Sequence, residues 1–228
     1  MTAQDRKRAI VTAALPLFAR KGFAETTTKD LARAAQISEP LLYRHFPSKE
    51  ALYLEIQDFS CQGTDPVVRQ LSELKPSART LVRLVFYLMR ALIVGLPKAT
   101  PEWDTRHRLM LNSLLHDGVF ARLIYQNRFD FFCARIEESL RAAIKSRDVV
   151  PMPVTSANRA RFAHHVGAWI AGVYLPNRPA MDYKVDRNEL LDEAMWFVLR
   201  GMGMTDRAIK HHYKRARMDE VFAEAKVK

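Results

Sequence analysis

Glycine and cysteine are both scarce in this chain. It contains 8 glycines among 228 residues, against an average usage of about 7%, and this shortage favours helices over turn-rich sheets. The two cysteines, Cys61 and Cys133, are too far apart for a metal-binding motif and too few for a disulfide framework. We interpret both as reduced packing residues.

Long apolar runs are also missing from the sequence. The longest uninterrupted one, Val166 to Leu175, has ten residues, whereas a membrane-spanning helix needs about 20. The first residues, Met1 to Arg8, lack the apolar stretch of a secretory signal. We therefore expect a cytoplasmic protein without a membrane segment. Disorder is excluded as well, because 48% of the residues are hydrophobic.

The usual signatures of catalysis do not occur. The sequence has no nucleophile motif, no glycine-rich phosphate loop and no zinc signature. His164 and His165 are adjacent, so on a helix they point to different sides and make a poor ligand pair. His211 and His212 lie in a basic segment, and His107 has no glutamate or cysteine at metal spacing. We expect no enzymatic activity, no metal and no cofactor.

Acidic residues are outnumbered along the whole chain. There are 36 Lys and Arg residues against 25 Asp and Glu, which gives a net charge of +11. This balance favours polyanionic partners, above all nucleic acid, or an anionic membrane surface. Residues 1–50 hold nine basic and five acidic side chains, so the basic excess is not confined to one segment.

The spacing of apolar residues predicts an all-α protein. The N-terminal helix has one buried stripe, and we expect it to bend at Pro16 and to end near Gly22. The stripe consists of Ile10, Ala13, Ala14, Leu17 and Phe18. Further along, Gly, Pro, Asp and Ser punctuate the chain and predict helices near residues 66–75, 77–94, 101–115, 118–147, 157–174, 187–201 and 205–222.

Two short helices follow the N-terminal one. Thr27 is placed to cap a helix over about residues 28–35, and Ser38 is placed to cap a second one that Pro47 ends. Together with the N-terminal helix they predict a helix-turn-helix. We expect a helix-turn-helix domain over residues 1–50 and a larger helical domain over residues 51–228.

The run from Thr26 to Leu52 resembles the DNA-binding signature of the TetR family of transcriptional regulators. The residues that carry the match are Ala13-Ala14, Leu17 to Phe23, Leu42-Tyr43, Phe46, Ser48-Lys49-Glu50 and Leu52. The resemblance covers about residues 6–56, roughly a quarter of the chain. It implies an N-terminal three-helix module joined to a helical domain that binds a ligand and dimerises.

The resemblance also implies which residues contact DNA. They are Thr28, Lys29, Ser38, Glu39, Pro40, Leu41, Tyr43, Arg44, His45 and Lys49. Phosphate contacts are implied for Thr28, Ser38, Tyr43, His45 and Lys49, and a base contact is implied for Lys29, which is long enough to reach a guanine. Arg44 fits either kind of contact. Lys29 and Lys49 could instead be solvated, and Tyr43 and His45 could pack against the protein.

Three positions depart from the family's commonest pattern. Gln36 stands where glycine usually fills the turn, so either a side chain must tolerate positive φ or the turn differs. Glu39 places a carboxylate near phosphate, where its value lies in accepting from a cytosine amino group. Leu41 replaces a usual hydroxyl and could touch a thymine methyl group instead.

Two further clusters are candidates for binding in the larger domain. A small-molecule pocket, which the resemblance implies, is expected to be lined by Phe86, Tyr87, Arg90, Trp103, His107 and Met110. The dimer interface is expected at small residues on one helix and bulky residues on the next. These are Ala163, Gly167, Ala168, Ala171, Gly172, Met195, Trp196 and Leu199. An ordinary aromatic core and packing within one chain would give the same two patterns.

These features predict a dimeric regulator of transcription that binds double-stranded DNA and a small-molecule effector. In this family such a regulator is most often a repressor that binds a palindromic operator and is released by an inducer. Two other classes stay open. One is a helical enzyme or carrier with a vestigial DNA-binding head, and the other is an architectural protein that binds DNA without sequence preference.

Overall fold

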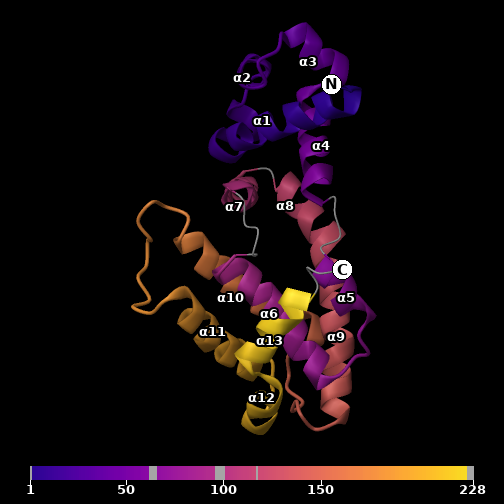
Figure 1. The fold of residues 1–228 in the computed structure, drawn as a ribbon, viewed down its shortest axis with the longest axis vertical. Helices are drawn as coiled ribbons and strands as arrows, with labels where there is room; N and C mark the ends of the chain where they lie inside the picture. The colour runs from indigo at the N-terminus through magenta and orange to yellow at the C-terminus, as the bar shows by residue number, and fades with distance from the viewer. Residues whose placement is uncertain (1, 62–65, 96–100, 117, 225–228) are drawn as a thin grey trace. The chain divides into compact units, whose positions relative to one another are not determined.

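The described residues of the chain are helical (Figure 1). The structure is a computed structural model that describes residues 2–61, 66–95, 101–116 and 118–224, without some of the helical side chains in these ranges. Besides α-helices these residues form one π-helical turn and an isolated bridge between Val149 and Met204. The predicted all-α class is confirmed. None of the described helices has the length and apolar character needed to cross a membrane.

The chain divides into two compact units. Unit 1 comprises Met1–Gln62 and Ala99–Arg128, and unit 2 comprises Gly63–Lys98 and Phe129–Lys228. The helices of unit 1 are α1 (Ala3–Glu25), α2 (Thr28–Ala34), α3 (Glu39–His45), α4 (Lys49–Cys61), α7 (Pro101–Leu115) and α8 (Val119–Ile124). The helices of unit 2 are α5 (Pro66–Glu73), α6 (Ala78–Ile93), α9 (Asp130–Lys145), α10 (Ser156–Val173), α11 (Arg187–Gly201), α12 (Asp206–His212) and α13 (Arg215–Glu224). The functional division expected at residue 50 stays a prediction.

Unit 1 is built around one apolar core. Phe18 of α1 is fully buried, and it shares that core with Leu31 of α2, Leu42 of α3, Ile56 of α4 and Leu109 of α7. The side chain of Asn112 donates a hydrogen bond of 2.8 Å to the carbonyl oxygen of Ala19, which ties α7 to α1. Burial of the shared apolar surface therefore holds α7 and the first four helices together.

The first helix differs from the sequence prediction in two respects. Its buried stripe is Ile10, Val11, Ala14, Leu15, Phe18 and Ala19, whereas Ala13 and Leu17 are only half-buried. Pro16 lies inside α1 on its exposed side, where water can satisfy the carbonyl group that loses its N–H partner. Non-helical backbone inside α1 occurs at Gly22, with φ 76° and ψ 176°, near where the sequence predicted that the helix ends, and α1 continues beyond it to Glu25.

The core of unit 2 is organised around α6. This helix packs against α9, α10, α11 and α12, and Leu81, Val82, Val85 and Met89 along it are completely buried. Its buried residues cover most of its circumference, and the remaining polar side carries Arg79, Arg83 and Arg90. The sequence prediction of a helix near residues 77–94 is confirmed.

Two breaks inside predicted helices are new. The helix expected over residues 118–147 is divided by a π-helical turn, Tyr125–Phe129, into α8 and α9. The helix expected over 205–222 stops at Tyr213, which adopts an extended backbone between α12 and α13. The break allows the Tyr213 hydroxyl to donate a hydrogen bond to Asp192 while its ring packs 6.0 Å from that of Phe86.

A buried guanidinium joins the start of α10 to the end of α11. Arg159 donates to the carbonyl oxygens of Val154, Met202 and Met152 at 3.0, 3.1 and 3.2 Å. Burial lowers the pKa of Arg159, and the three carbonyl acceptors supply the hydrogen bonds that a buried cation requires. This side chain therefore stabilises the turns at one end of unit 2.

Candidate nucleic-acid interface

Two capped helices joined by a tight turn form the head of unit 1. The hydroxyl of Thr27 accepts from the backbone N–H of Asp30 at the start of α2, and the hydroxyl of Ser38 accepts from that of Leu41 at the start of α3. The turn between them places Gln36 at φ 53°. The sequence had left open whether a side chain occupies a positive φ here, and it does. The geometry of α2 and α3 is that of a helix-turn-helix.

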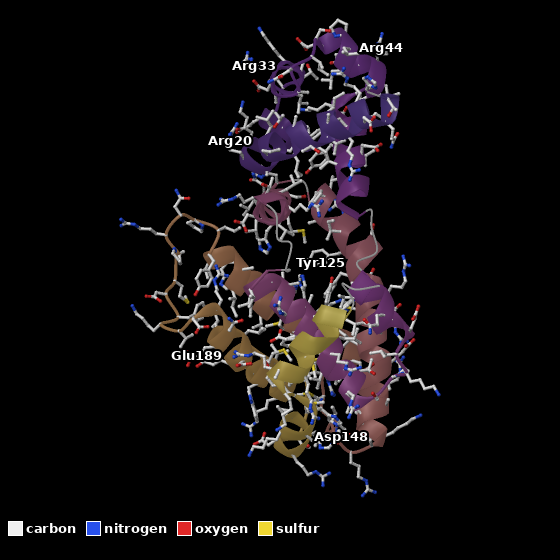
Figure 2. All side chains as sticks on the ribbon, viewed as in Figure 1. Arg20, Arg33, Arg44, Tyr125, Asp148 and Glu189 are labelled. Atoms are coloured by element: carbon white, nitrogen blue, oxygen red, sulfur yellow. The ribbon has the colours of Figure 1, made fainter. Side chains whose placement is uncertain are left out.

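The apolar side of α3 sets which residues face outward. Leu42 and Phe46 are buried in the core of unit 1, and the opposite side presents Pro40, Tyr43 and Arg44 to solvent. The side chain of Tyr43 is 46% exposed. Arg44, and Arg33 near the end of α2, project away from the protein (Figure 2). Such a face can enter a major groove without rearrangement of the core.

Lys29 and Thr28 begin α2 and have different surroundings. Lys29 is exposed, as a base or phosphate contact requires. Thr28 is half-buried, and its hydroxyl donates a hydrogen bond of 2.8 Å to Oε2 of Glu39, the first residue of α3. The sequence resemblance implied DNA contacts for Thr28 and Glu39. It gave no signal that these two residues bind each other, because they are eleven positions apart.

Lys49 has a structural role that the sequence did not indicate. Its ammonium group donates to the carbonyl oxygens of Phe23 at 2.9 Å and Thr26 at 3.1 Å, and it lies 4.3 Å from the centroid of the Phe23 ring. These contacts fix the start of α4 against the last turn of α1 and against Thr26, which follows α1. A lysine has three N–H donors, so one remains for the predicted phosphate contact.

The other predicted contacts are less exposed. His45 and Leu41 are half-buried, and Ser38 already accepts a backbone hydrogen bond as the cap of α3. A salt bridge of 2.9 Å between Lys21 and Asp30 holds α1 to α2. Hydrogen bonds from Lys21 and Thr27 lower the pKa of Asp30. Its carboxylate therefore stays charged and maintains the salt bridge between α1 and α2.

The head of unit 1 matches a known family of DNA-binding domains. Residues 10–56 fit the model of the bacterial regulatory proteins of the tetR family. This N-terminal segment is therefore similar to the tetR family. It is 46% identical over 57 residues to the HTH-type transcriptional regulator EthR of Mycolicibacterium smegmatis, a match that covers 25% of this chain and 26% of EthR. It is 32% identical over 80 residues to the uncharacterized regulator YuxN of Bacillus subtilis, over 35% of this chain and 28% of YuxN.

The matched segments thus span only about a quarter of the length of these relatives. Both relatives are named transcriptional regulators. Solved structures share the fold over more of the chain. AibR in complex with isovaleryl coenzyme A and operator DNA has a TM-score of 0.63 at 17% identity, over 88% of this chain and 100% of AibR. NalD of Pseudomonas aeruginosa has a TM-score of 0.58 at 20% identity, over 90% of this chain and 100% of NalD.

The predicted pocket residues are divided between the two units. In unit 2 the ring of Phe86 is fully buried, that of Tyr87 lies 5.8 Å from Phe132, and Arg90 forms a salt bridge of 3.2 Å with Asp219. In unit 1 His107 is half-buried and Met110 packs against the core. The side chain of Trp103 lies outside the described residues. The set stays a prediction.

A small cavity lies within unit 1 near the end of α1. Phe23, Tyr53, Leu109 and Ser113 are among the residues that line it, and its volume is about 10 Å³. That is room for about one water molecule, so the cavity cannot hold an effector. None of the six predicted pocket residues is part of its wall.

The predicted dimer residues mostly pack within one chain. Ala163, Gly167 and Ala171 are buried, and a Cβ atom on Gly167 would lie 2.9 Å from Cδ1 of Leu92 and 3.0 Å from Sδ of Met89, both on α6. Met195 and Leu199 are also completely buried, while Ala168, Gly172 and Trp196 are half-buried. Packing within one chain, the alternative reading of this pattern, therefore accounts for the small-residue stripe at Gly167.

Another face of α10 and α11 presents large aromatic side chains that the sequence prediction did not assign. Phe162 and Trp169 are 56% and 68% exposed on α10, and Phe197 is 69% exposed on α11. Phe162 and Trp169 are seven positions apart and so lie on one side of α10. The two helices contact each other. The i, i+7 spacing of Phe162 and Trp169 indicates that they share a face of α10. The sequence does not tell which apolar face of the helix is buried within the chain and which is left exposed.

Proposed function

We propose that the protein is a DNA-binding regulator of transcription that binds a two-fold symmetric operator as a dimer. The observation that carries this proposal is the outward face of α3, where Pro40, Tyr43 and Arg44 are exposed while Leu42 and Phe46 anchor the helix. The nine basic residues among the first 50 supply the attraction to phosphate. Repression is the simplest outcome, because a bound dimer blocks access to a promoter.

Dimerisation is supported by the exposed aromatic residues of α10 and α11. Phe162, Trp169 and Phe197 leave an apolar surface in solvent, and aromatic residues are enriched at the energetic centres of protein interfaces. A dimer related by a two-fold axis presents two copies of α3, and these read the two halves of a palindromic site. Residues of the predicted interface that are half-buried, Ala168, Gly172 and Trp196, would lie at its border.

An effector site in this protein is supported by likeness to a ligand-binding neighbour. AibR, which has the same fold, was solved with isovaleryl coenzyme A and operator DNA. In this chain α7 shares a core with the head through Leu109, and its Asn112 donates a hydrogen bond to α1. A displacement of α7 would therefore also displace α1. The effector must prefer one of two states of the protein to change its DNA affinity.

Selection of bound duplexes from random DNA tests the proposed function. The full chain should enrich a two-fold symmetric motif whose half-sites are separated by about one helical turn, roughly 34 Å, or a multiple of it. Retention of all duplexes with equal affinity would indicate an architectural protein. Failure to retain any duplex at low salt would indicate a vestigial head on a carrier or an enzyme.

A further inference from the structure

The hydrogen bond between Thr28 and Glu39 joins the two helices of the head at their first residues. Thr28 Oγ1 donates to Glu39 Oε2 over 2.8 Å, and both side chains are half-buried. Lys29 and Pro40, the next residue on each helix, are exposed. The bonded pair therefore lies beside the surface that, under the proposed function, meets DNA.

The bond restricts what Thr28 can do at a DNA surface. A threonine hydroxyl carries a single proton, and that proton is donated to Glu39 in the structure. A phosphate oxygen only accepts hydrogen bonds, so Thr28 cannot donate to a phosphate and to Glu39 at the same time. Placing a phosphate there would also bring its charge next to the carboxylate, which Coulomb repulsion disfavours.

Few groups on DNA can donate a hydrogen bond to the carboxylate of Glu39. An ionised carboxylate only accepts hydrogen bonds, which excludes phosphates, the N7 and O6 atoms of guanine and the O4 atom of thymine. The donors on the base edges of the major groove are the amino groups of cytosine and adenine. Adenine presents the acceptor N7 beside its amino group, and this atom would face the second carboxylate oxygen. Cytosine presents its amino group without such an acceptor on the same base.

We propose that Glu39 is a specificity-determining residue that selects cytosine in each half-site, and that Thr28 is a positioning residue that acts through it. Thr28 holds the carboxylate by the 2.8 Å hydrogen bond instead of contacting a phosphate. This inference rests on the proposed function. It replaces the phosphate contact that the sequence resemblance implied for Thr28 with a contribution that depends on the base.

Duplex selection with variants tests this inference. The parent should enrich a cytosine at one symmetric pair of positions in the motif. Glu39→Gln should shift that preference to adenine, because a glutamine amide pairs with both N6 and N7 of adenine. Thr28→Val should lower the cytosine preference by about tenfold, because Glu39 is then no longer held in place for its base contact, and Thr28→Ser should restore it. Preferences are compared as ratios, since removing the charge of Glu39 strengthens binding to all duplexes.

The outcomes separate this inference from the proposed function. If the parent enriches no motif, the proposed function fails and the inference fails with it. If the parent enriches a motif and Glu39→Gln keeps the same cytosine preference, only the inference is overturned. It is also overturned if Thr28→Val lowers affinity for selected and random duplexes equally, because a phosphate contact would give that result. Thermal unfolding of each variant confirms that the compared proteins are folded.

Discussion

Polar side chains in the head of unit 1 serve the protein as well as its predicted partner. Lys49 directs two N–H groups at the carbonyl oxygens of Phe23 and Thr26, and the hydroxyl of the fully buried Thr26 donates to the carbonyl oxygen of Gly22 at 2.6 Å. The segment between α1 and α2 is thus held by side-chain hydrogen bonds where the helical pattern is interrupted.

Replacing Lys49 tests its structural role. Lys49→Met keeps the aliphatic stem but leaves two carbonyl groups without their charged donor, and hydrogen bonds to charged groups contribute about 1.5–3 kcal/mol. The free energy of unfolding, measured in denaturant, should fall by an amount in that range. Lys29→Met is the matched control, because Lys29 is exposed, and its stability should stay near that of the parent. Equal stability of the two variants would contradict the role assigned to Lys49.

Gln36 carries a backbone conformation that favours glycine. A φ of 53° costs a residue with a side chain roughly 1–2 kcal/mol. A glycine avoids this cost, but it loses more conformational freedom on folding, which offsets part of the stabilisation. Gln36→Gly should therefore raise the free energy of unfolding by about 0.5–1 kcal/mol. Gln36→Ala keeps the strain and should give no increase. A stabilised alanine variant would show that the side chain, not the backbone, is responsible.

His212 should make stability depend on pH. Burial lowers its pKa from 6.5, although Asp148 lies 3.7 Å away and opposes that shift. The unfolded chain then binds a proton that the folded chain does not, so stability is fully present above about pH 6.5 and falls as the pH drops through this value. The thermal midpoint should fall less for His212→Asn than for the parent between about pH 7.5 and pH 5.5. Identical decreases would contradict this assignment, and His165→Asn, at an exposed position on α10, is the control.

At the scale of elements, helix ends are predictable because their signals are local. The first turns of α6, α10 and α11 each donate backbone N–H groups to the side-chain oxygen of the residue before the helix. These capping residues are Ser77, Thr155 and Asp186. The π-helical turn at Tyr125–Phe129 and the break at Tyr213 could not be predicted in this way, since tertiary packing produces them. Tyr213 leaves the helix to reach Asp192 and Phe86, residues distant in the sequence.

The residues predicted to contact DNA show the same division between local and tertiary signals. The outward position of Pro40, Tyr43 and Arg44 follows from the burial of Leu42 and Phe46 at helical spacing. The bonds of Thr28 with Glu39 and of Lys49 with Phe23 and Thr26 depend on how helices meet. No local pattern specifies such partners, so helical spacing predicts which side of α3 is exposed but not the contacts beneath it.

The stripe of small residues on α10 can be tested by filling it. A side chain at Gly167 meets Leu92 and Met89 at contact distance, so Gly167→Leu should lower the free energy of unfolding by about 1–3 kcal/mol, as overpacking does. Gly201→Leu is the matched control in α11, because no atom lies within 4 Å of a Cβ built there. If the Gly167→Leu protein is as stable as this control but monomeric, packing within one chain is contradicted, and the small residues of α10 belong to the dimer interface.

At the scale of the whole molecule, assembly and DNA binding are linked by the proposed two-fold symmetry. The proposed dimer surface is apolar and includes Trp169 and Phe197, so a charge there should be costly only if a second copy covers it. The double variant Trp169→Glu with Phe197→Glu should be monomeric by sedimentation and should bind a selected operator much more weakly than the parent.

Met181 provides the control for this experiment. It is 52% exposed between α10 and α11, and Met181→Glu should leave both the oligomeric state and the operator affinity unchanged. An intact dimer of the double variant would contradict the interface assigned to Trp169 and Phe197. A monomer that keeps the full operator affinity would contradict the need for two reading heads.

The most direct test of sequence-specific DNA binding is the ratio of affinities for a selected operator and a random duplex, measured at one salt concentration. The account predicts a ratio of at least about a thousand for the parent, as regulators that read base edges show. Tyr43→Phe, which removes a predicted phosphate contact, should weaken both affinities and leave the ratio unchanged. A parent ratio near one would contradict the account, because charge alone would then explain the binding.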